Sequence, residues 1–461
     1  MSQASEMEQR DARTTAAGKP GRSLSVAPTM LLRGEPSFPS SKYYTLRYLL
    51  AATLAEGESQ ILFPALSEDS EALFRGCRAL GAQLDWLGGP GERLQVRGVG
   101  RPRAAGAVTI NVGNAGAVLR LLLGVAAWLP QVTFVTDQPQ SLGRRPNREL
   151  LQALEALGVR VEAQGPEGYL PITLYGGQPH GGRVMVSGAR SSQYVSALLF
   201  LAPLLAEPLT IEVVDGLTSQ VMVQLTLKVL RQAGIVIEHD AALRRFLVPA
   251  PQAYRAGTYV VPGDYPSAAA LLAACAAMPD PASELRLGRL PAGEEDGEAL
   301  VAALLALGCD LRREGETLYV RGGRPLRGLE LDGSRMIDCI PVLVALACFA
   351  EGRTVFYNVE NLHYKESDRI NDLCAELQRA GCRVTPLPDA IVVEGQPEGV
   401  EGGVWVDGHS DHRLLQALTI VGMRSRRGLS LRGVEHVAKS FPHFFSELQR
   451  LGAVVSPALS W

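Results

Sequence analysis

A short pattern recurs six times along the chain, and it limits the possible folds more than any other feature. Each copy is an amphipathic helix ending in leucine or alanine, then a glycine, then an alternating apolar run. Successive glycines are 71 to 77 residues apart, and a glycine after the last helical turn is a common C-cap. Each unit is therefore expected to end in helix, strand, turn, strand. The glycines are Gly81, Gly158, Gly234, Gly308, Gly381 and Gly452.

A second helix, rich in alanine and leucine, recurs in the other half of each unit. That composition is typical of a helix buried on most sides. The residues at or near its six starts are Lys42, Asn114, Ser191, Asp264, Asp338 and Asp411. Asn, Ser and Asp are good N-caps, but lysine is a poor one, so capping does not explain Lys42.

Six units divide naturally into two domains of three units. If the buried helices run in a common direction, their N-termini meet at one face, and helix N-termini attract anions. We place the crossovers between the domains near Ser41 and Gly263. This predicts a disordered tail over 1–27, a first domain over 42–262, and a second domain from 28–41 plus 263–461.

Composition excludes several classes of protein. The 461 residues include 45 basic and 48 acidic side chains and are 46% hydrophobic, as expected for a soluble globular protein. A net charge of −3 disfavours a nucleic-acid partner. The longest apolar stretch, 121–135, is interrupted and too short to span a membrane, and the first 24 residues lack the apolar core of a signal peptide.

The cysteines and lysines add two expectations. Seven cysteines form no CxxC pair and lie in apolar surroundings, which favours reduced thiols and a cytoplasmic protein, and we expect a monomer. Only five basic residues are lysine, so we expect a lysine kept against this bias to be needed for its compact ammonium. These are Lys19, Lys42, Lys228, Lys365 and Lys439. Codon usage suffices to explain Lys19 and Lys228.

Polar residues gather at the predicted starts of the buried helices. There, cations outnumber carboxylates although the whole chain is slightly acidic, which indicates a small polyanionic substrate. The segments that carry them are SKYYTLR, GNAGAVLR, RRP, SSQ, NLHYKESDR, SDHR and AKSFP, in that order.

Together these segments resemble the 5-enolpyruvylshikimate-3-phosphate synthase family, whose members are enolpyruvyl (1-carboxyvinyl) transferases of aromatic amino-acid synthesis. The resemblance covers residues 28 to 456. It implies an α/β (α+β) fold of two domains, each with three βαβαββ repeats, around a closing cleft. It also implies that no metal and no organic cofactor is needed.

The resemblance further implies a role for each cleft residue. Phosphoenolpyruvate would be held by Lys42, Asn114, Gly116, Arg145, Gln193, Arg369, Arg413 and Lys439. Shikimate 3-phosphate would be held by Lys42, Tyr43, Arg47, Ser191, Ser192, Gln193, Ser219, Asp338, Asn361 and Lys365. Asp338 would accept the proton of the attacking 5-hydroxyl, and Glu366 with Lys42 would handle protons at the methylene group and the bridging oxygen. Desolvation on closure is expected to offset the depressed pKa of the two carboxylates.

Four positions depart from the family pattern. Tyr43 stands where serine is usual, and Met222 where tyrosine is usual. Both belong to the acceptor side, and a Tyr43 hydroxyl could replace the missing tyrosine contact from the opposite wall. Ala117 replaces a common threonine and His363 a common arginine, which are milder changes.

Two alternative functions stay open. One is a carboxyvinyl transferase that uses a UDP-sugar, a nucleoside or a specialised metabolite as acceptor. The UDP-N-acetylglucosamine enzyme characteristically has a Lys-Asn pair and a loop cysteine, whereas here Tyr43 follows Lys42 and no cysteine lies between Cys77 and Cys275. The other is a non-catalytic binding protein that retains the cleft.

A metal site is also considered at the sixth helix start. The residues Asp407, His409, Asp411 and His412 could ligate a metal, but their spacing fits no common zinc motif.

Overall fold

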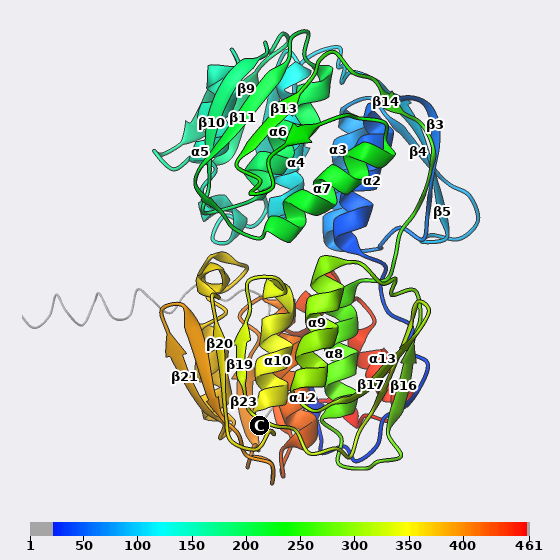
Figure 1. Cartoon of the computed structure of the whole chain (residues 1–461), viewed down its shortest axis with the longest axis vertical. Helices are drawn as coiled ribbons and strands as arrows, with labels where there is room; N and C mark the ends of the chain where they lie inside the picture. The colour runs from blue at the N-terminus through cyan, green and yellow to red at the C-terminus, as the bar shows by residue number, and fades with distance from the viewer. Residues whose placement is uncertain (1–21, 459–461) are drawn as a thin grey trace, which may run out of the picture.

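The computed structural model describes residues 22–458, and within them six separate β-sheets form two bodies (Figure 1). In the second, third, fifth and sixth units a buried helix joins two parallel strands, whereas in the first and fourth units the parallel partner comes from a segment near a domain crossover. In five units a second helix leads into two antiparallel strands, and in the sixth the N-terminal segment Ser23–Val26 supplies one of the two. The predicted α/β fold of two three-unit domains is confirmed. None of the helices in this part of the chain is long and apolar enough to cross a membrane.

The six buried helices form the centres of the two bodies. Every residue of the fourth and fifth of these helices is buried, because their apolar residues cover the whole helix surface. They are α2 (Lys42–Leu54), α4 (Gly116–Val125), α6 (Gln193–Leu201), α8 (Tyr265–Ala276), α10 (Ile340–Ala347) and α12 (His412–Arg424).

The second helix of each unit packs with one face on this centre. These helices are α3 (Glu68–Ala79), α5 (Arg148–Ala156), α7 (Gln220–Gln232), α9 (Glu295–Ala306), α11 (Asn371–Arg379) and α13 (Phe444–Leu451). Short 3₁₀ helices extend several elements: η1 (Ala126–Trp128), η2 (Leu142–Arg144), η3 (Ala202–Leu204), η4 (Ile337–Cys339), η5 (Glu360–Tyr364) and η6 (Val434–Lys439).

The upper body in Figure 1 contains three sheets. The first is β14 (Tyr254–Arg255) and β15 (Thr258–Val260), both on β3 (Ala55–Leu62), then β5 (Arg93–Val99) and β4 (Gln83–Trp86). The second is β6 (Val108–Asn111), β7 (Val132–Val135), β9 (Tyr169–Tyr175) and β8 (Arg160–Gln164). The third is β10 (Gly182–Gly188), β11 (Leu209–Leu217), β13 (Arg245–Val248) and β12 (Glu238–His239).

The lower body has three matching sheets. The first is β2 (Arg33–Gly34), β16 (Glu284–Leu287), β18 (Thr317–Arg321) and β17 (Asp310–Glu314). The second is β19 (Glu330–Asp332), β20 (Arg353–Tyr357), β22 (Ala390–Glu394) and β21 (Arg383–Leu387). The third is β23 (Val404–Asp407), β24 (Leu429–Arg432), β1 (Ser23–Val26) and β25 (Val455–Pro457).

The six repeat glycines end the second helix of each unit, as the sequence predicts. Their φ angles lie between +82° and +117°, a range that side chains with a Cβ rarely adopt. The prediction of a left-handed glycine C-cap is therefore confirmed in all six units.

A further set of glycines was not predicted. They lie at or just after the last strand in four units, where that strand passes over the end of the buried helix. A Cβ at Gly98, Gly176 or Gly395 would lie 1.9 to 2.1 Å from a carbonyl oxygen there, and at Gly322 it would lie 2.8 Å away. Only glycine allows two backbones to approach this closely.

The chain crosses between the bodies twice, along two neighbouring segments. Ser40 and Gly263 form an isolated antiparallel bridge, and the Ser41 amide donates to the Pro262 carbonyl at 2.7 Å. Two separate hydrophobic cores correspond to the two bodies, one with residues between 44 and 261 and the other with residues 26–38 and 265–455.

The predicted tail was too long at its C-terminal end. Residues 1–21 lie outside the described part of the chain, but Ser23–Val26 form β1, which pairs antiparallel with both β24 and β25. This segment is the strand between β24 and β25 in the sixth sheet, held by long-range pairings that have no local signal in the sequence.

Candidate active site

A polar cleft lies between the two bodies, at the N-terminal ends of the buried helices. Each of the six helices contributes a residue from its start to the cleft wall: Lys42, Gly116, Gln193, Pro266, Cys339 and His412. Such an arrangement points six sets of helix N–H groups at one space, which favours a polyanion. Of the predicted site residues, all but Asn114 line this cleft.

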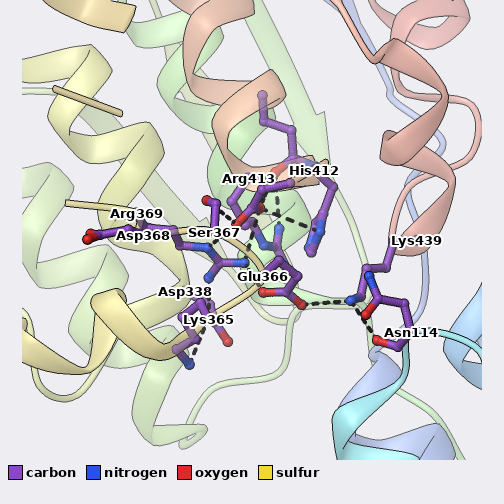
Figure 2. A network of polar contacts seen from close by, with 12 residues as sticks. Asn114, Asp338, Lys365, Glu366, Ser367, Asp368, Arg369, His412, Arg413 and Lys439 are labelled. Atoms are coloured by element: carbon purple, nitrogen blue, oxygen red, sulfur yellow. Dashed lines mark hydrogen bonds and ion pairs between the residues drawn. The ribbon is translucent and has the colours of Figure 1, made fainter. Parts of the chain in front are cut away.

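Arg369 is the centre of the lower wall. Its guanidinium is buried and reaches three carboxylates: Nε donates to Asp411 at 2.7 Å, Nη1 to Asp338 at 2.8 Å, and Nη2 to Glu366 at 2.7 Å. Figure 2 shows Arg369 and Glu366, from the segment before α11, close to Asp338 of η4. The arginine therefore fixes the positions of both predicted catalytic carboxylates.

Asp411 is a cap that also holds the two arginines. Its side chain is fully buried, accepts from the Arg413 amide at 2.8 Å, and accepts from the Ser367 hydroxyl at 3.1 Å. The sequence predicted its capping role, but its contact with Arg369 came only from the structure.

Lys439 joins the two domains. Its ammonium lies 2.9 Å from Glu366 Oε1 and donates to the backbone carbonyl of Asn114 at 3.0 Å (Figure 2). Asn114, predicted to contact phosphoenolpyruvate, thus offers its carbonyl to the lysine and does not line the cleft. The cause is local: α4 starts at Gly116, so Asn114 lies in the turn before the helix.

The upper wall combines cations with hydrogen-bonding side chains. Lys42 Nζ lies 2.9 Å from Asp69 Oδ2, and both side chains are largely buried. Arg120 donates to Gln193 Oε1 at 2.9 Å. Neither Asp69 nor Arg120 was among the predicted ligands, although Arg120 lies in the GNAGAVLR segment.

Arg47 forms its hydrogen bonds within its own domain. It is buried and donates to Thr226 Oγ1 at 2.8 Å and to the carbonyls of Met222 and Tyr43, both at 3.1 Å. The guanidinium therefore ties α2 to α7. It also shows that Tyr43 and Met222 belong to the same wall, so the expectation that Tyr43 acts from the wall opposite Met222 was wrong.

The Tyr43 hydroxyl crosses the cleft and donates to Asp338 Oδ2. Burial, and then the Asp338 carboxylate, raise the pKa of Tyr43 well above its usual value, so the phenol stays protonated. Lys365 approaches the other oxygen of Asp338, with Nζ 3.3 Å from Oδ1.

The two predicted catalytic carboxylates are ionised. Burial alone would raise the pKa of Asp338, but the nearby cations outweigh burial and hold it well below its usual range; they are Lys365, Arg369 and Arg413. Burial likewise fails to raise the pKa of Glu366, which Lys439 and Arg369 hold well below its usual value. The expected offset by desolvation is therefore not found in the protein without substrates.

Lys42 carries a positive charge, whereas His412 is neutral. Burial lowers the pKa of Lys42, but Asp69 and Glu366 more than compensate, and the net shift is upward. Burial and Arg413 hold the pKa of His412 well below its usual value, so its ring is neutral. The cleft thus offers one firmly protonated lysine next to an ionised Glu366.

Lys228, which codon usage was expected to explain, makes a contact between the domains. Its ammonium on α7 lies 2.6 Å from Glu294 of the second domain, and Glu294 also accepts from the Tyr44 hydroxyl at 2.7 and 2.8 Å. All four described lysines therefore pair with a carboxylate in or beside the cleft. Glu294 precedes α9 and carries no local motif that could have revealed this role.

Two side chains of the metal site considered above make other contacts. His409 Nε2 lies 3.1 Å from Glu376, and Asp411 is occupied by Arg369. Within residues 22–458, no group of three or more His, Cys, Asp or Glu side chains is arranged to hold a metal ion.

Comparison with known proteins agrees with this geometry. The family model of EPSP synthase (3-phosphoshikimate 1-carboxyvinyltransferase) matches residues 26–448. The chain is 46% identical over 430 residues to 3-phosphoshikimate 1-carboxyvinyltransferase of Deinococcus radiodurans, covering 93% of this chain and 95% of that protein. It is 37% identical over 433 residues to the same enzyme of Burkholderia pseudomallei, covering 94% and 95%.

Solved structures show the same fold. An EPSP synthase from Acinetobacter baumannii superposes with a TM-score of 0.81 at 23% identity, covering 95% of this chain and 100% of that one. An enolpyruvyl transferase from Streptomyces tendae gives 0.75 at 18% identity, covering 96% and 100%. On the family match and these identities, the chain belongs to the EPSP synthase (3-phosphoshikimate 1-carboxyvinyltransferase) family.

Proposed function

We infer that the protein transfers the enolpyruvyl group of phosphoenolpyruvate to the 5-hydroxyl of shikimate 3-phosphate and releases phosphate. Its place is then the synthesis of chorismate and the aromatic amino acids. The observation that carries this inference is the cleft, where six helix starts and a surplus of cations surround two ionised carboxylates. Its curated relatives bear the name of this activity over more than nine-tenths of their length.

We propose that phosphoenolpyruvate lies between the arginines and lysines of the two domains. The residues offered are Lys42, Arg145, Arg369, Arg413 and Lys439, with Gly116 and Gln193 beside them. A Cβ at Gly116 would lie 3.1 Å from Arg145 Nη1, so this glycine leaves room for the guanidinium. Arginine forks bind carboxylate and phosphate through paired hydrogen bonds. Asn114 enters this set only by holding Lys439.

The acceptor then occupies the remaining part of the cleft. Ser191, Ser192 and Ser219 come from the starts of α6 and α7, where hydroxyls and helix N–H groups suit a phosphate. Lys365 and Asn361 face them from the second domain, with Tyr43 and Arg47 on the wall of α2. Such a site distinguishes a phosphorylated acceptor from an unphosphorylated one.

The proton transfers follow from the charge states. Asp338 accepts the proton of the attacking hydroxyl while its oxygen adds to C2 of phosphoenolpyruvate and C3 takes up a proton, which gives the tetrahedral intermediate. Loss of a C3 proton and cleavage of the C2–O bond to phosphate then restore the double bond and release phosphate. Lys42 is protonated at the start and serves as donor, whereas Glu366 is ionised and serves as acceptor. Two bound polyanions neutralise the surrounding cations, which raises the pKa of Asp338 toward that of a useful base.

The test is phosphate release from phosphoenolpyruvate with three separate acceptors. We expect turnover with shikimate 3-phosphate and none with unphosphorylated shikimate or a UDP-sugar. Asp338→Ala should lower kcat at least about 100-fold, the usual range for a general base. Asp332→Asn, an exposed carboxylate of the same domain, should retain turnover. Full turnover in Asp338→Ala, or preference for another acceptor, would refute the assignment.

We also propose that the protein acts as a cytoplasmic monomer. One chain supplies residues from all six helix starts, so the cleft needs no second copy. All seven cysteines are free and buried, as suits a reducing compartment. Sedimentation at working concentration should give the mass of one chain.

A further inference from the structure

Tyr43 and Asp338 are joined across the cleft by a hydrogen bond. Asp338 Oδ1 accepts from Arg369 at 2.8 Å and lies 3.3 Å from Lys365 Nζ. Oδ2 accepts the Tyr43 hydroxyl. The two oxygens of the carboxylate therefore have different partners, cations on one and a neutral donor on the other.

Of the two oxygens of Asp338, Oδ2 has an uncharged partner and is the better site for a substrate hydroxyl that gives up its proton. Oδ1 already faces two cations, whereas the Tyr43 bond to Oδ2 comes from an uncharged group that can be replaced. A hydrogen bond to an ionised carboxylate also lowers its basicity. The Tyr43 hydroxyl thus occupies the atom where the acceptor must bind, and it weakens the base while it remains there.

We propose that Tyr43 is a positioning residue that holds Asp338 in the free protein and is displaced by the hydroxyl of the acceptor. This rests on the function proposed above, in which Asp338 takes that proton. Because the bond exists in the free protein and is lost in the complex, it opposes acceptor binding. Its loss restores the basicity of Asp338 when the substrate arrives.

The structure provides space for the displaced phenol. A second cavity adjoins the cleft, and Tyr43, Met222 and Asp296 line both. The backbone of Tyr43 is held by Arg47, so the side chain can rotate while α2 stays in place. Met222 is flexible and can yield to a moving ring. Tyr43 and Met222 therefore act together: the tyrosine ring moves, and the methionine side chain makes room for it.

The experiment compares wild type with Tyr43→Phe, which keeps the ring and removes the donor. Calorimetric titration with shikimate 3-phosphate should show tighter binding by about threefold to tenfold, the size of one hydrogen bond. The KM for shikimate 3-phosphate should fall by the same factor. The KM for phosphoenolpyruvate should stay within about twofold, since the bond between Tyr43 and Asp338 lies on the acceptor side of the cleft.

Tyr44→Phe is the matched control, because it also loses a tyrosine hydroxyl that bonds across the domains, here to Glu294. It should not tighten acceptor binding. Unchanged affinity in Tyr43→Phe would overturn the inference, and weaker affinity would mean that Tyr43 binds the acceptor directly, which also overturns it. Failure of the wild type to bind shikimate 3-phosphate would overturn both the proposed function and this inference. If the wild type turns over but Tyr43→Phe binds shikimate 3-phosphate with wild-type affinity, only the inference is overturned.

Discussion

At the scale of residues, the site is a small set of buried charges that hold one another in place. Arg369 has three carboxylate partners, and each of these has a further partner of its own. Breaking a buried ion pair is costly because the remaining charge is left unpaired. The lower wall is therefore rigid, since no side chain of the set can rotate away without leaving the charge of another unpaired.

The depressed pKa of Asp338 gives a pH prediction. A carboxyl whose folded pKa lies below its unfolded value, about 3.9, stabilises the fold above that value and loses this effect as pH falls. Asp338→Asn should therefore lower the free energy of unfolding by about 2 kcal/mol at neutral pH. The gap between variant and wild type should stay constant down to about pH 5 and shrink below about pH 4.

Denaturant unfolding of both proteins from pH 8 to pH 3 measures this gap. A gap that widens on acidification would show that the carboxyl is strained by burial and that the neighbouring cations do not stabilise it.

At the scale of elements, both glycine sets serve the junction of helix and strand. The repeat glycines were predictable because a C-cap follows a helical period directly in the sequence. Gly98, Gly176, Gly322 and Gly395 were not, because their constraint comes from the end of a helix several tens of residues earlier. Helix starts were predicted within three residues, since apolar periodicity is a local signal.

Gly395 offers a sharp test of this close approach. A Cβ there would lie 1.9 Å from the Ala350 carbonyl oxygen, and neither backbone can yield cheaply. We expect Gly395→Ala to lower the free energy of unfolding by at least about 2 kcal/mol, as overpacking does. Gly106→Ala meets no atom within 4 Å and should be nearly neutral in the same denaturant titration. Equal stability of the two variants would contradict the role assigned to Gly395.

At the scale of the whole molecule, the domains touch at points that are 66 to 325 residues apart in the chain. Lys439 reaches Asn114, Tyr43 reaches Asp338, and Glu294 receives Tyr44 and Lys228. Motifs predicted which residues would face the cleft. Motifs could not predict these pairs, because no local pattern around a carboxylate such as Glu294 or Asp69 indicates which distant residue it contacts.

Glu294 should favour the closed arrangement from outside the substrate site. We expect Glu294→Gln to raise the KM of both substrates by about fivefold, since a partly buried pair between domains is worth about 1 kcal/mol. Small-angle scattering with both substrates should show a larger radius than for wild type. Glu295→Gln is the control, because Glu295 pairs with Arg335 of its own domain at 3.1 Å. Equal effects of the two variants would rule out a closing role for Glu294.

The position of β1 between β24 and β25 has a consequence for synthesis on the ribosome. The first domain is one uninterrupted stretch and can fold as soon as it has emerged. The second domain contains both the first and the last strand of residues 22–458, so β1 has no pairing partner in its own sheet until β24 and β25 have been made. A nascent chain stalled before β25 should therefore hold one finished domain and one open sheet, whose exposed edge is a binding site for chaperones.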